Sequence, residues 1–460
     1  MRPVPMLFGT DGIRGVAGRY PLDRVTVRRI GAALVRALPA QREPHRVLIG
    51  RDTRESGVWM EAELSRGIVG QGARVSTVGI VPTPAVAYLT RAERFDAGIV
   101  ISASHNPFED NGIKMFSGAG EKFSEAIERQ IEHIIADTSW TTPDGGDDEA
   151  AGQRFVDDYL RHLDAVLDVP PSSSSRAAGS LRQQLARLTI AVDCANGATT
   201  PVAPRLFDAL GLRAVYIGNQ PDGRNINLDC GSTHPEQLVA LVRSSGAALG
   251  VAFDGDGDRA IFVDHTGRVV DGDAILFICA RQLKAEGRLR GDAIVATVMS
   301  NIGLELALAQ LGISMARCAV GDKYVMEEMA ARGLSLGGEQ SGHIIFSDYL
   351  STGDGLCTAL NVLRTVAATG RTLADLAGDL RTYPQVLVNL RVREKVDLRT
   401  IPAVASVVER VEQRLVGGGR LLVRYSGTEP LLRVMIEGQD QNDIRVWATE
   451  IIDAAREHLG

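Results

Sequence analysis

The chain has 460 residues, of which 45% are hydrophobic and 23% are charged, and its formal net charge is −7. At roughly 150 residues per domain, this length indicates about three domains rather than one shared core. The composition is typical of a folded globular protein, and the acidic balance excludes a broad nucleic-acid-binding face, which would need a basic surface to neutralise phosphates.

The cysteines and the apolar runs indicate the cellular compartment of the protein. Five cysteines are widely spread and never in C-x-x-C spacing, so they predict neither a disulfide framework nor a zinc site. The first residues, MRPVPMLFGT, lack the apolar core of a secretory signal, and no later run approaches the ~18 apolar residues of a membrane span. We therefore expect a cytoplasmic protein with no membrane or nucleic-acid partner.

Three apolar runs each lead into a polar turn and a helix-like stretch: RVLIGRDTR from Arg46, LTIAVDCANGA from Leu188 and AIVATVMSN from Ala293. This pattern predicts three strand-loop-helix units of the α/β class. Continuous apolar strands indicate parallel pairing with helices on both faces. Residues 138–152 and 170–180 are poor in apolar side chains and are expected to be connections or insertions, the second being the best domain boundary.

From about Pro384 the pattern changes to strand, helix, strand, tight turn, strand and helix. The runs are VLVNLRV, IPAVASVVERVEQRL, RLLVRY and LLRVMIEG, followed by a final helix. This order predicts a smaller C-terminal domain of the α+β class.

The first loop with chemical potential is SASHNP, residues 102–107, after the apolar run AGIVI. Loops at strand ends are common active-site positions in open α/β sheets, so Ser104 is a candidate nucleophile. No G-x-S-x-G elbow surrounds it, which disfavours a hydrolytic triad. The alternative is that Ser102, Ser104 and Asn106 only satisfy the backbone groups of a turn.

The second loop is DGDGDR, with Asp254, Asp256 and Asp258 after another apolar run. Three carboxylates at alternate positions face the same way, and at ~4 Å each pair would repel by about 4 kcal/mol at an effective dielectric near 20. An all-oxygen cluster of this kind suits magnesium. The twelve-residue calcium loop does not fit, because Arg259 and His265 stand where it needs glycine and glutamate, and an acidic solvent turn is the remaining alternative.

The third loop is GGEQSGH, in which Glu339, Ser341 and His343 would project to one side of an extended segment. They offer an acceptor, a hydroxyl and a titratable ring to a polyol such as a sugar. A glycine-rich turn with a surface histidine is the alternative.

The fourth loop is RYSGTEP, between two strand-like runs. Arg424 can hold a phosphate bidentately, and Ser426, Gly427 and Thr428 supply short donors, with Arg433 adding charge. An ordinary hairpin turn is the alternative. Together, the four loops combine a nucleophile, a metal site, a sugar reader and a second anion site, which is the set that a phosphosugar mutase needs.

Several long motifs resemble one known family in its own order. They are LFGTDGIRG from Leu7, ISASHNPFEDNGIKMF, DGDGDR, VGDKYV, GGEQSGHI, STGDGL and RYSGTEPLLRVMIEG. The chain resembles the α-D-phosphohexomutase superfamily and, within it, the bacterial phosphoglucosamine mutases. The resemblance implies three related α/β domains with mixed sheets and a C-terminal TATA-box-binding-protein-like domain around a central cleft. We expect boundaries at 1–170, 171–268, 269–380 and 381–460.

The resemblance also implies roles for the motif residues. Ser104 would carry the phosphate and bind Mg²⁺ with Asp254, Asp256 and Asp258. The predicted catalytic groups around it are Arg14, His105, Lys114, Arg259 and His343. The predicted substrate-binding residues are Glu339, Ser341, Lys323, Arg424, Ser426, Gly427, Thr428 and Arg433.

The implied reaction interconverts glucosamine 6-phosphate and glucosamine 1-phosphate through a 1,6-bisphosphate, in amino-sugar synthesis. The substrate is a small hexosamine phosphate, and the enzyme would be a monomer or homodimer. Lys323 stands where many relatives have arginine. Lysine is also cationic, but it lacks the planar guanidinium fork that binds a phosphate through two hydrogen bonds. A phosphomannomutase or phosphoglucomutase would share the chemistry, and a catalytically silent sugar-phosphate sensor is the alternative from another class.

Overall fold

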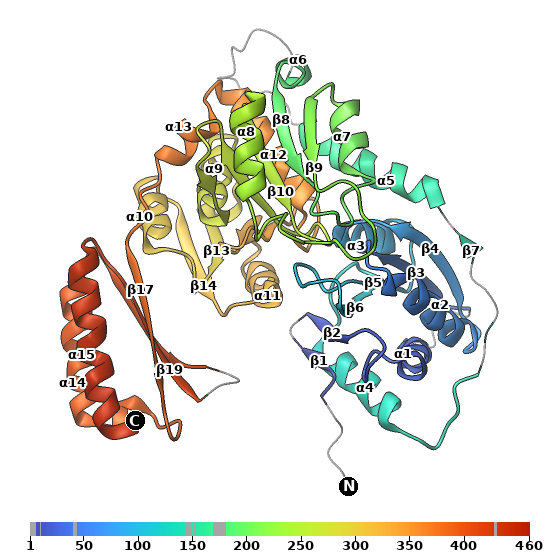
Figure 1. Cartoon of the computed structure of the whole chain (residues 1–460), viewed down its shortest axis with the longest axis horizontal. Helices are drawn as coiled ribbons and strands as arrows, with labels where there is room; N and C mark the ends of the chain where they lie inside the picture. The colour runs from blue at the N-terminus through green and yellow to red at the C-terminus, as the bar shows by residue number, and fades with distance from the viewer. Residues whose placement is uncertain are drawn as a thin grey trace. The chain divides into compact units, whose positions relative to one another are not determined.

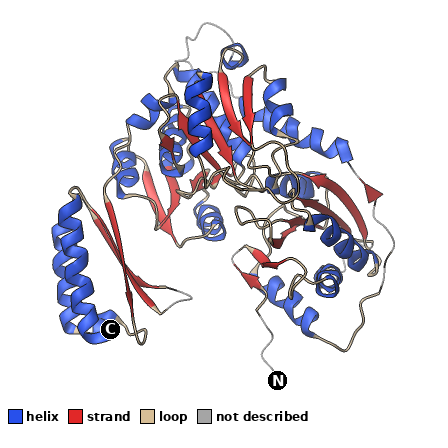
Figure 2. Cartoon of the chain, in the orientation of Figure 1, coloured by secondary structure: helices blue, strands red, loops and turns tan. Residues whose placement is uncertain are grey.

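The computed structural model describes residues 6–9, 11–39, 44–143, 145, 149–150, 152–168, 181–426 and 430–460. The chain divides into two compact units. The first comprises Met1–Met299 with Ile313–Gly378, and the second comprises Ser300–Gly312 with Asp379–Gly460. Figure 2 shows strands alternating with helices in the first unit and helices beside one sheet in the second.

The first sheet has the strand order β1-β2-β6-β5-β3-β4-β7. In that order the strands span Phe8–Gly9, Gly12–Val16, Asp110–Ser117, Ala97–Ile101, Arg46–Arg51, Arg74–Ile80 and Glu149–Ala150. Helices α1 (Arg24–Ala37), α2 (Ser56–Val69) and α4 (Glu125–Ala136) share a hydrophobic core with one face of this sheet (Figure 1). Helix α3 (Thr83–Ala92) packs on the opposite face, where Gly50 and Gly98 leave room for Val86 and Thr90.

The second sheet has the order β12-β11-β10-β8-β9 and the third has the order β14-β13-β15-β16. The strands of the second sheet span Val269–Val270, Ala260–Asp264, Leu249–Phe253, Thr189–Asp193 and Arg213–Ile217, and those of the third span Ser314–Cys318, Ala293–Thr297, Leu336–Gly338 and Ile344–Phe346. The accompanying helices of the first unit are α5 (Gly152–Asp164), α6 (Leu181–Leu185), α7 (Ala203–Ala209), α8 (Glu236–Ser245), α9 (Gly272–Ala285), α11 (Asp322–Arg332), α12 (Gly355–Thr369) and α13 (Leu373–Gly378).

One four-strand arrangement recurs in all three sheets. In each, the first strand of the repeat (β3, β8 or β13) lies between two parallel neighbours, one of which is the strand that follows it in the chain. The other neighbour, β5, β10 or β15, is followed by an antiparallel strand, β6, β11 or β16. The sheets are therefore mixed and the three α/β domains are related in topology, as the family resemblance implied. The parallel pairing indicated by the apolar runs holds only for the inner strands, because the last strand of each repeat runs antiparallel.

The second unit is built on a three-stranded antiparallel sheet, β17-β19-β18. These strands span Gln385–Arg391, Leu431–Glu437 and Arg420–Tyr425. Helices α14 (Pro402–Leu415) and α15 (Gln441–Leu459) bury one face of the sheet through Leu432, Val434 and Ile436. Helix α10 (Ile302–Gln310) belongs to this unit, where Glu437 accepts hydrogen bonds from Asn301 and from the Ile302 N–H.

The predicted α/β class with a smaller C-terminal α+β domain is confirmed, and each of the three strand-loop-helix units is present. The segment 138–152 includes β7 and the start of α5, whereas the segment 170–180 lies outside the described residues. The domain boundaries themselves stay predictions. No helix in the described part of the chain is both long and apolar enough to cross a membrane. All five cysteines are free thiols.

Candidate active site

Three of the four predicted loops occupy the same position in the repeated topology. Each connects the third strand of a repeat to its antiparallel fourth strand: residues 102–109 follow β5, residues 254–259 follow β10 and residues 339–343 follow β15. Within the first unit, Ser104 contacts Asp254, and Asp258 contacts His343. The shared topology therefore brings the loops predicted to carry the nucleophile, the metal ligands and the sugar-binding residues to one place.

Ser104 is buried and has a strained backbone, with φ at +52°. Its hydroxyl donates to Asp254 Oδ2 at 2.5 Å, and its Oγ lies 3.4 Å from His105 Nδ1. Left-handed conformations are uncommon for residues other than glycine and cluster at functional sites. The loop therefore aims the predicted nucleophile at the first of the predicted metal ligands.

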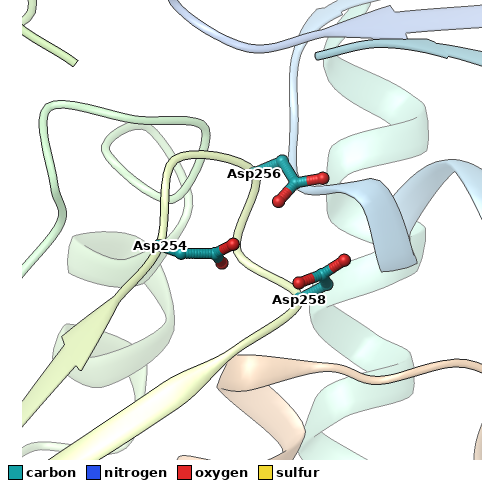
Figure 3. A group of neighbouring side chains, drawn as sticks. All are labelled: Asp254, Asp256 and Asp258. Atoms are coloured by element: carbon teal, nitrogen blue, oxygen red, sulfur yellow. The ribbon is translucent and has the colours of Figure 1, made fainter. Parts of the chain in front are cut away.

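The three aspartates converge in the loop between β10 and β11 (Figure 3), and one carboxylate oxygen of each lies within 4.8 Å of the others. All three are buried, which raises the repulsion between them. Asp256 Oδ1 and Asp258 Oδ1 are buried and have no hydrogen-bond partner among the described residues. Hard carboxylate oxygens with open positions fit a divalent cation such as Mg²⁺.

The local charges separate the pKa values of two of these carboxyl groups. Burial, reinforced by Asp258 and Asp256, raises the pKa of Asp254 well above its usual range. Burial acts the same way on Asp258, but Lys114 and His343 outweigh it and hold the pKa of Asp258 below its usual range. In the absence of a cation, the cluster thus compensates by favouring the neutral form of one member.

The loop of the three aspartates (the metal loop, residues 254–259) and the loop of Ser104 (the serine loop, residues 102–109) approach each other so closely that only glycine fits between them. A Cβ added to Gly255 would lie 2.5 Å from the Ser104 carbonyl oxygen. Glycine 257, two residues on, has φ at +72°, which favours glycine for a different reason. Gly255 is therefore required by packing and Gly257 by its backbone conformation.

Lys114 on β6 is the central cation of the site. Its Nζ lies 2.7 Å from Asp256 Oδ2, 3.0 Å from Asp11 Oδ2 and 3.4 Å from Asp258 Oδ2. Burial alone would lower the pKa of Lys114, but these three carboxylates raise it well above its usual range. Lys114 is therefore a fixed positive charge beside the aspartates.

The other predicted catalytic groups surround Ser104. Arg14 on β2 donates from Nη1 to the Ala103 carbonyl at 3.1 Å and forms an ion pair with Asp11. The Arg259 N–H donates to Asp254 Oδ1 at 3.1 Å. Burial, together with Arg259 and Arg14, lowers the pKa of His105, so that this ring is neutral at neutral pH.

His343 is buried beside the aspartates, with Nδ1 at 3.5 Å from Asp258 Oδ1. Burial alone would lower its pKa, whereas Asp258, Asp322 and Glu339 raise the pKa of His343 to about 9. The Gly353 N–H donates to Nε2 at 3.0 Å, however, and only the neutral ring can accept there. This hydrogen bond requires the neutral ring, and a cation bound to the aspartates would favour that form, since it would offset much of the charge that raises the pKa of His343.

The sugar-reading loop is less tightly bonded. Glu339 Oε1 accepts the Gly321 N–H at 2.9 Å, and the Ser341 hydroxyl donates to Glu339 Oε2 at 3.3 Å. Glu339 is buried at the edge of the site, whereas Ser341 is exposed. Lys323 Nζ bonds Glu125 Oε1 at 3.1 Å, so its predicted phosphate-binding role stays a prediction.

A cavity of about 610 Å³ lies against these loops in the first unit, a size suited to a small ligand. Six of the predicted site residues line it: Arg14, His105, Asp258, Arg259, Glu339 and His343. Asp11 and Asp322 also reach its wall. The cavity thus carries both cations for a phosphate and acceptors for hydroxyl groups.

The fourth predicted loop lies in the second unit. Arg424 and Arg433 are directly opposite each other on β18 and β19, on the sheet face that points away from α14 and α15. Like charges placed opposite each other are destabilising, and an anion between them would relieve that cost. Ser426 is buried at the base of the hairpin, and Gly427 and Thr428 lie outside the described residues.

Comparisons with known proteins cover most of the chain. Four models of the phosphoglucomutase/phosphomannomutase family match: alpha/beta/alpha domains I, II and III at residues 5–142, 157–267 and 271–383, and the C-terminal domain at residues 387–454. The chain belongs to the phosphoglucomutase/phosphomannomutase family. It is therefore an enzyme of the phosphohexomutase class.

Relatives of this phosphohexomutase align over nearly their full length. A phosphoglucosamine mutase of Solibacter usitatus is 48% identical over 455 residues, which covers 99% of each chain. The structure of a phosphoglucomutase/phosphomannomutase family protein of Burkholderia thailandensis has a TM-score of 0.79 at 26% identity, over 99% of this chain and 98% of that one. Aspergillus fumigatus N-acetylphosphoglucosamine mutase, solved with GlcNAc-6P and magnesium, shares the fold at a TM-score of 0.62 and 20% identity, over 95% of this chain and 87% of that one.

Several residues of the phosphohexomutase site were not singled out by the sequence. Thr83, at the start of α3, donates from Oγ1 to Asp256 Oδ2 at 2.6 Å. Lys122 Nζ bridges Asp11 Oδ1 at 2.8 Å and Asp322 Oδ2 at 2.5 Å. Asp52 and Arg54, both fully buried, lie directly after β3. The available signal was a charged or hydroxyl residue in each strand-to-helix turn, as in GRDTR and PTP.

Proposed function

We propose that this phosphohexomutase interconverts glucosamine 6-phosphate and glucosamine 1-phosphate through a phosphorylated Ser104 and a bound 1,6-bisphosphate. The main support is the contact of the Ser104 hydroxyl with the aspartate cluster, beside a cavity lined by cations and hydroxyl acceptors. The glucosamine substrate is supported by the full-length likeness to phosphoglucosamine mutases.

Asp254, Asp256, Asp258 and the phosphate on Ser104 would hold Mg²⁺. When bound, the cation would offset negative charge on the phosphoryl oxygens. Lys114, Arg14 and Arg259 would add fixed positive charge around the same group, in the manner of phosphoryl-transfer sites that act by positioning and electrostatics.

In the forward direction, the O1 hydroxyl of glucosamine 6-phosphate attacks the phosphorus of phosphorylated Ser104. A new P–O1 bond forms, the bond between Ser104 Oγ and phosphorus breaks, and the electron pair stays on Oγ. The hydroxyl proton leaves to a neighbouring base, for which the neutral rings of His343 and His105 are candidates, and Oγ regains a proton. After the bisphosphate turns around, its 6-phosphoryl group returns to Ser104 by the reverse steps.

The non-reacting phosphate is assigned to the C-terminal loop. Arg424 and Arg433 share one sheet face, and Ser426 lies at the base of the same hairpin, so they would grip a phosphate whichever end of the sugar carries it. Glu339 and Ser341 would read sugar hydroxyls. We also propose that the reaction takes place in the cytoplasm, in agreement with five free cysteines, and supplies amino-sugar synthesis.

A mutase assay run side by side on the 6-phosphates of glucosamine, glucose and mannose tests this proposal. We expect the highest kcat/KM with glucosamine 6-phosphate, no turnover by Ser104→Ala with or without added bisphosphate, and loss of activity in excess chelator. Equal or greater efficiency with mannose 6-phosphate would contradict the substrate, and turnover by Ser104→Ala would contradict the mechanism. Binding without turnover by the native chain would support a sugar-phosphate sensor instead.

A further inference from the structure

Arg54 is a fully buried arginine that is not one of the residues lining the cavity described above. Its Nε donates to Asp52 Oδ2 at 2.8 Å, and both side chains have 0% exposure. A buried charge is costly unless it is paired and hydrogen-bonded, so such a group needs a structural reason. The reason lies in the serine loop.

The Arg54 guanidinium donates to four backbone carbonyls that surround the serine loop. Nη2 bonds the carbonyl oxygens of Ser104 at 2.9 Å and Asn106 at 2.8 Å. Nη1 bonds those of Asp110 at 2.9 Å and of Pro107. The planar fork thus gathers the loop from the nucleophile to the start of β6, a geometry that a point charge cannot reproduce.

Asp52 reaches the nucleophile from the other side through Ser102. The Ser102 hydroxyl donates to Asp52 Oδ2 at 2.6 Å and accepts the Ser104 N–H at 3.0 Å. The peptide groups on both sides of the Ser104 Cα are therefore bonded to one buried ion pair, directly or through Ser102. These are the two groups whose orientation determines φ and ψ of Ser104, which is left-handed.

The second sheet's domain adds a further restraint to the same carbonyls. Asn227 Nδ2 donates to the Ser104 carbonyl at 2.9 Å and to the Asn106 carbonyl at 3.1 Å. The Ser104 carbonyl thus receives donors from both Arg54 and Asn227, while its hydroxyl faces Asp254. A loop restrained from so many directions has little freedom to turn its hydroxyl away.

We propose that Asp52, Arg54 and Ser102 are positioning residues that hold Ser104 in its left-handed conformation, so that its oxygen presents phosphate to the aspartate cluster in the same geometry at every transfer. This inference rests on the proposed role of Ser104 as phosphoryl acceptor. Small displacements of a reacting group are costly in rate but need not alter substrate affinity. The positioning residues should therefore affect kcat rather than KM.

Ser102→Ala is the gentlest test, and Ser335→Ala is its matched control. Ser335 is also buried, accepts one backbone N–H from Arg290 at 3.1 Å and donates to the Arg288 carbonyl at 3.2 Å. Each variant loses one donor and one acceptor. Dephosphorylated proteins are mixed with glucosamine 1,6-bisphosphate, and the phosphate on Ser104 is followed by intact mass after rapid quenching, alongside kcat, KM and Tm.

We expect Ser102→Ala to lower the phosphorylation rate and kcat at least tenfold, with KM within twofold and a Tm shift no larger than that of Ser335→Ala. A purely structural role predicts similar rates for the two variants. Rates within twofold of each other would overturn the proposal, as would a rise in KM that accounts for the lost efficiency.

Arg54→Lys provides a second measurement, because it keeps the charge but loses the fork. We expect it to lower kcat at least tenfold, and the double variant Ser102→Ala/Arg54→Lys to lose little more, since both changes release the same loop conformation. Losses that multiply would contradict a shared positioning role. If the native protein takes no phosphate on Ser104, the proposed function fails as well; if it does and Ser102→Ala is equally fast, only this inference fails.

Discussion

The serine-aspartate site of the first unit and the arginine pair of the second unit are constructed in opposite ways. Ser104, Lys114 and the three aspartates are buried, and hydrogen bonds or ion pairs join them to one another and to Thr83 and His343. Arg424 is exposed on an antiparallel sheet, directly opposite another arginine. The first region is therefore made of buried groups that bond one another, whereas Arg424 of the second presents positive charge to water.

The difference follows from what each region has to do. A transferring phosphoryl group changes bonds, so the groups around it must already be oriented in a site of low dielectric. A group that only holds a phosphate needs charge and reach, and solvation of the arginines between turnovers costs little. Substitutions in the first region should therefore reduce kcat, and substitutions in the second should raise KM.

Lys114→Met should have the largest effect. It leaves Asp11, Asp256 and Asp258 without their shared cation, and breaking a buried pair costs about 3–5 kcal/mol. We expect kcat to fall at least a thousandfold, measured in the mutase assay. Lys122→Met is the matched control, because Lys122 is also a largely buried cation paired with Asp11 but does not bond the aspartate cluster. Equal losses in the two variants would contradict the central role of Lys114.

In the first region, the sequence predicted the candidate catalytic residues but not the residues that hold them in place. Ser104 and the three aspartates follow apolar strands, so local pattern and residue type made them candidates, and the family resemblance gave their predicted roles. Arg54 and Thr83 act through contacts with residues 50 and 173 positions away, and no local pattern encodes such pairs. The equivalence of the serine, metal and sugar loops also depends on strand order, which becomes visible only when the sheets are assembled.

Arg433→Gln tests the second region. A charge-assisted hydrogen bond contributes about 1.5–3 kcal/mol, so its loss should raise KM for the sugar phosphate by roughly ten- to a hundredfold. We expect kcat to change less than KM, because the substitution removes a contact to the phosphate that does not react. Steady-state kinetics measures both effects, and thermal unfolding measures stability.

Arg414→Gln is the control for that variant. Arg414 belongs to the helical layer of the same domain and pairs with Glu450 at 3.1 Å. Its removal should leave KM unchanged and alter stability by less than about 1 kcal/mol, as is usual for an exposed pair. A rise in KM equal to that of Arg433→Gln would mean that net charge, rather than the arginine face, controls affinity.

Thr83→Val should have a smaller effect, which is a weaker affinity for Mg²⁺. Thr83 donates to Asp256 Oδ2, whereas Oδ1 is buried without a hydrogen-bond partner among the described residues. Loss of such a supporting bond weakens metal binding by about tenfold or more. We expect the Mg²⁺ concentration for half-maximal activity to rise by about that factor, with nearly full kcat at saturating Mg²⁺. Thr358→Val, at another buried threonine, is the control because its hydroxyl bonds only the Asp354 carbonyl in the described structure. Unchanged Mg²⁺ dependence in Thr83→Val would show that Asp256 is oriented without it.

The smallest effect should come from His162, which lies outside both regions. We expect it to influence the pH dependence of stability rather than activity. Its ring stacks on Tyr88 with the centroids 4.0 Å apart, and burial, helped by Arg91, lowers the pKa of His162 to about 4. The unfolded chain, with a pKa near 6.5, therefore binds a proton more readily than the folded one, so stability is complete above pH 6.5 and declines as the pH falls toward 4. After allowing for solvent screening of this half-buried group, we expect a loss of about 1–2 kcal/mol between pH 7 and pH 4.5, measured by urea unfolding. His162→Gln should remove that part of the decline in stability. The control His234→Gln, at an exposed histidine, should show the same decline as the native protein. An identical pH dependence in both variants would mean that another group causes the decline.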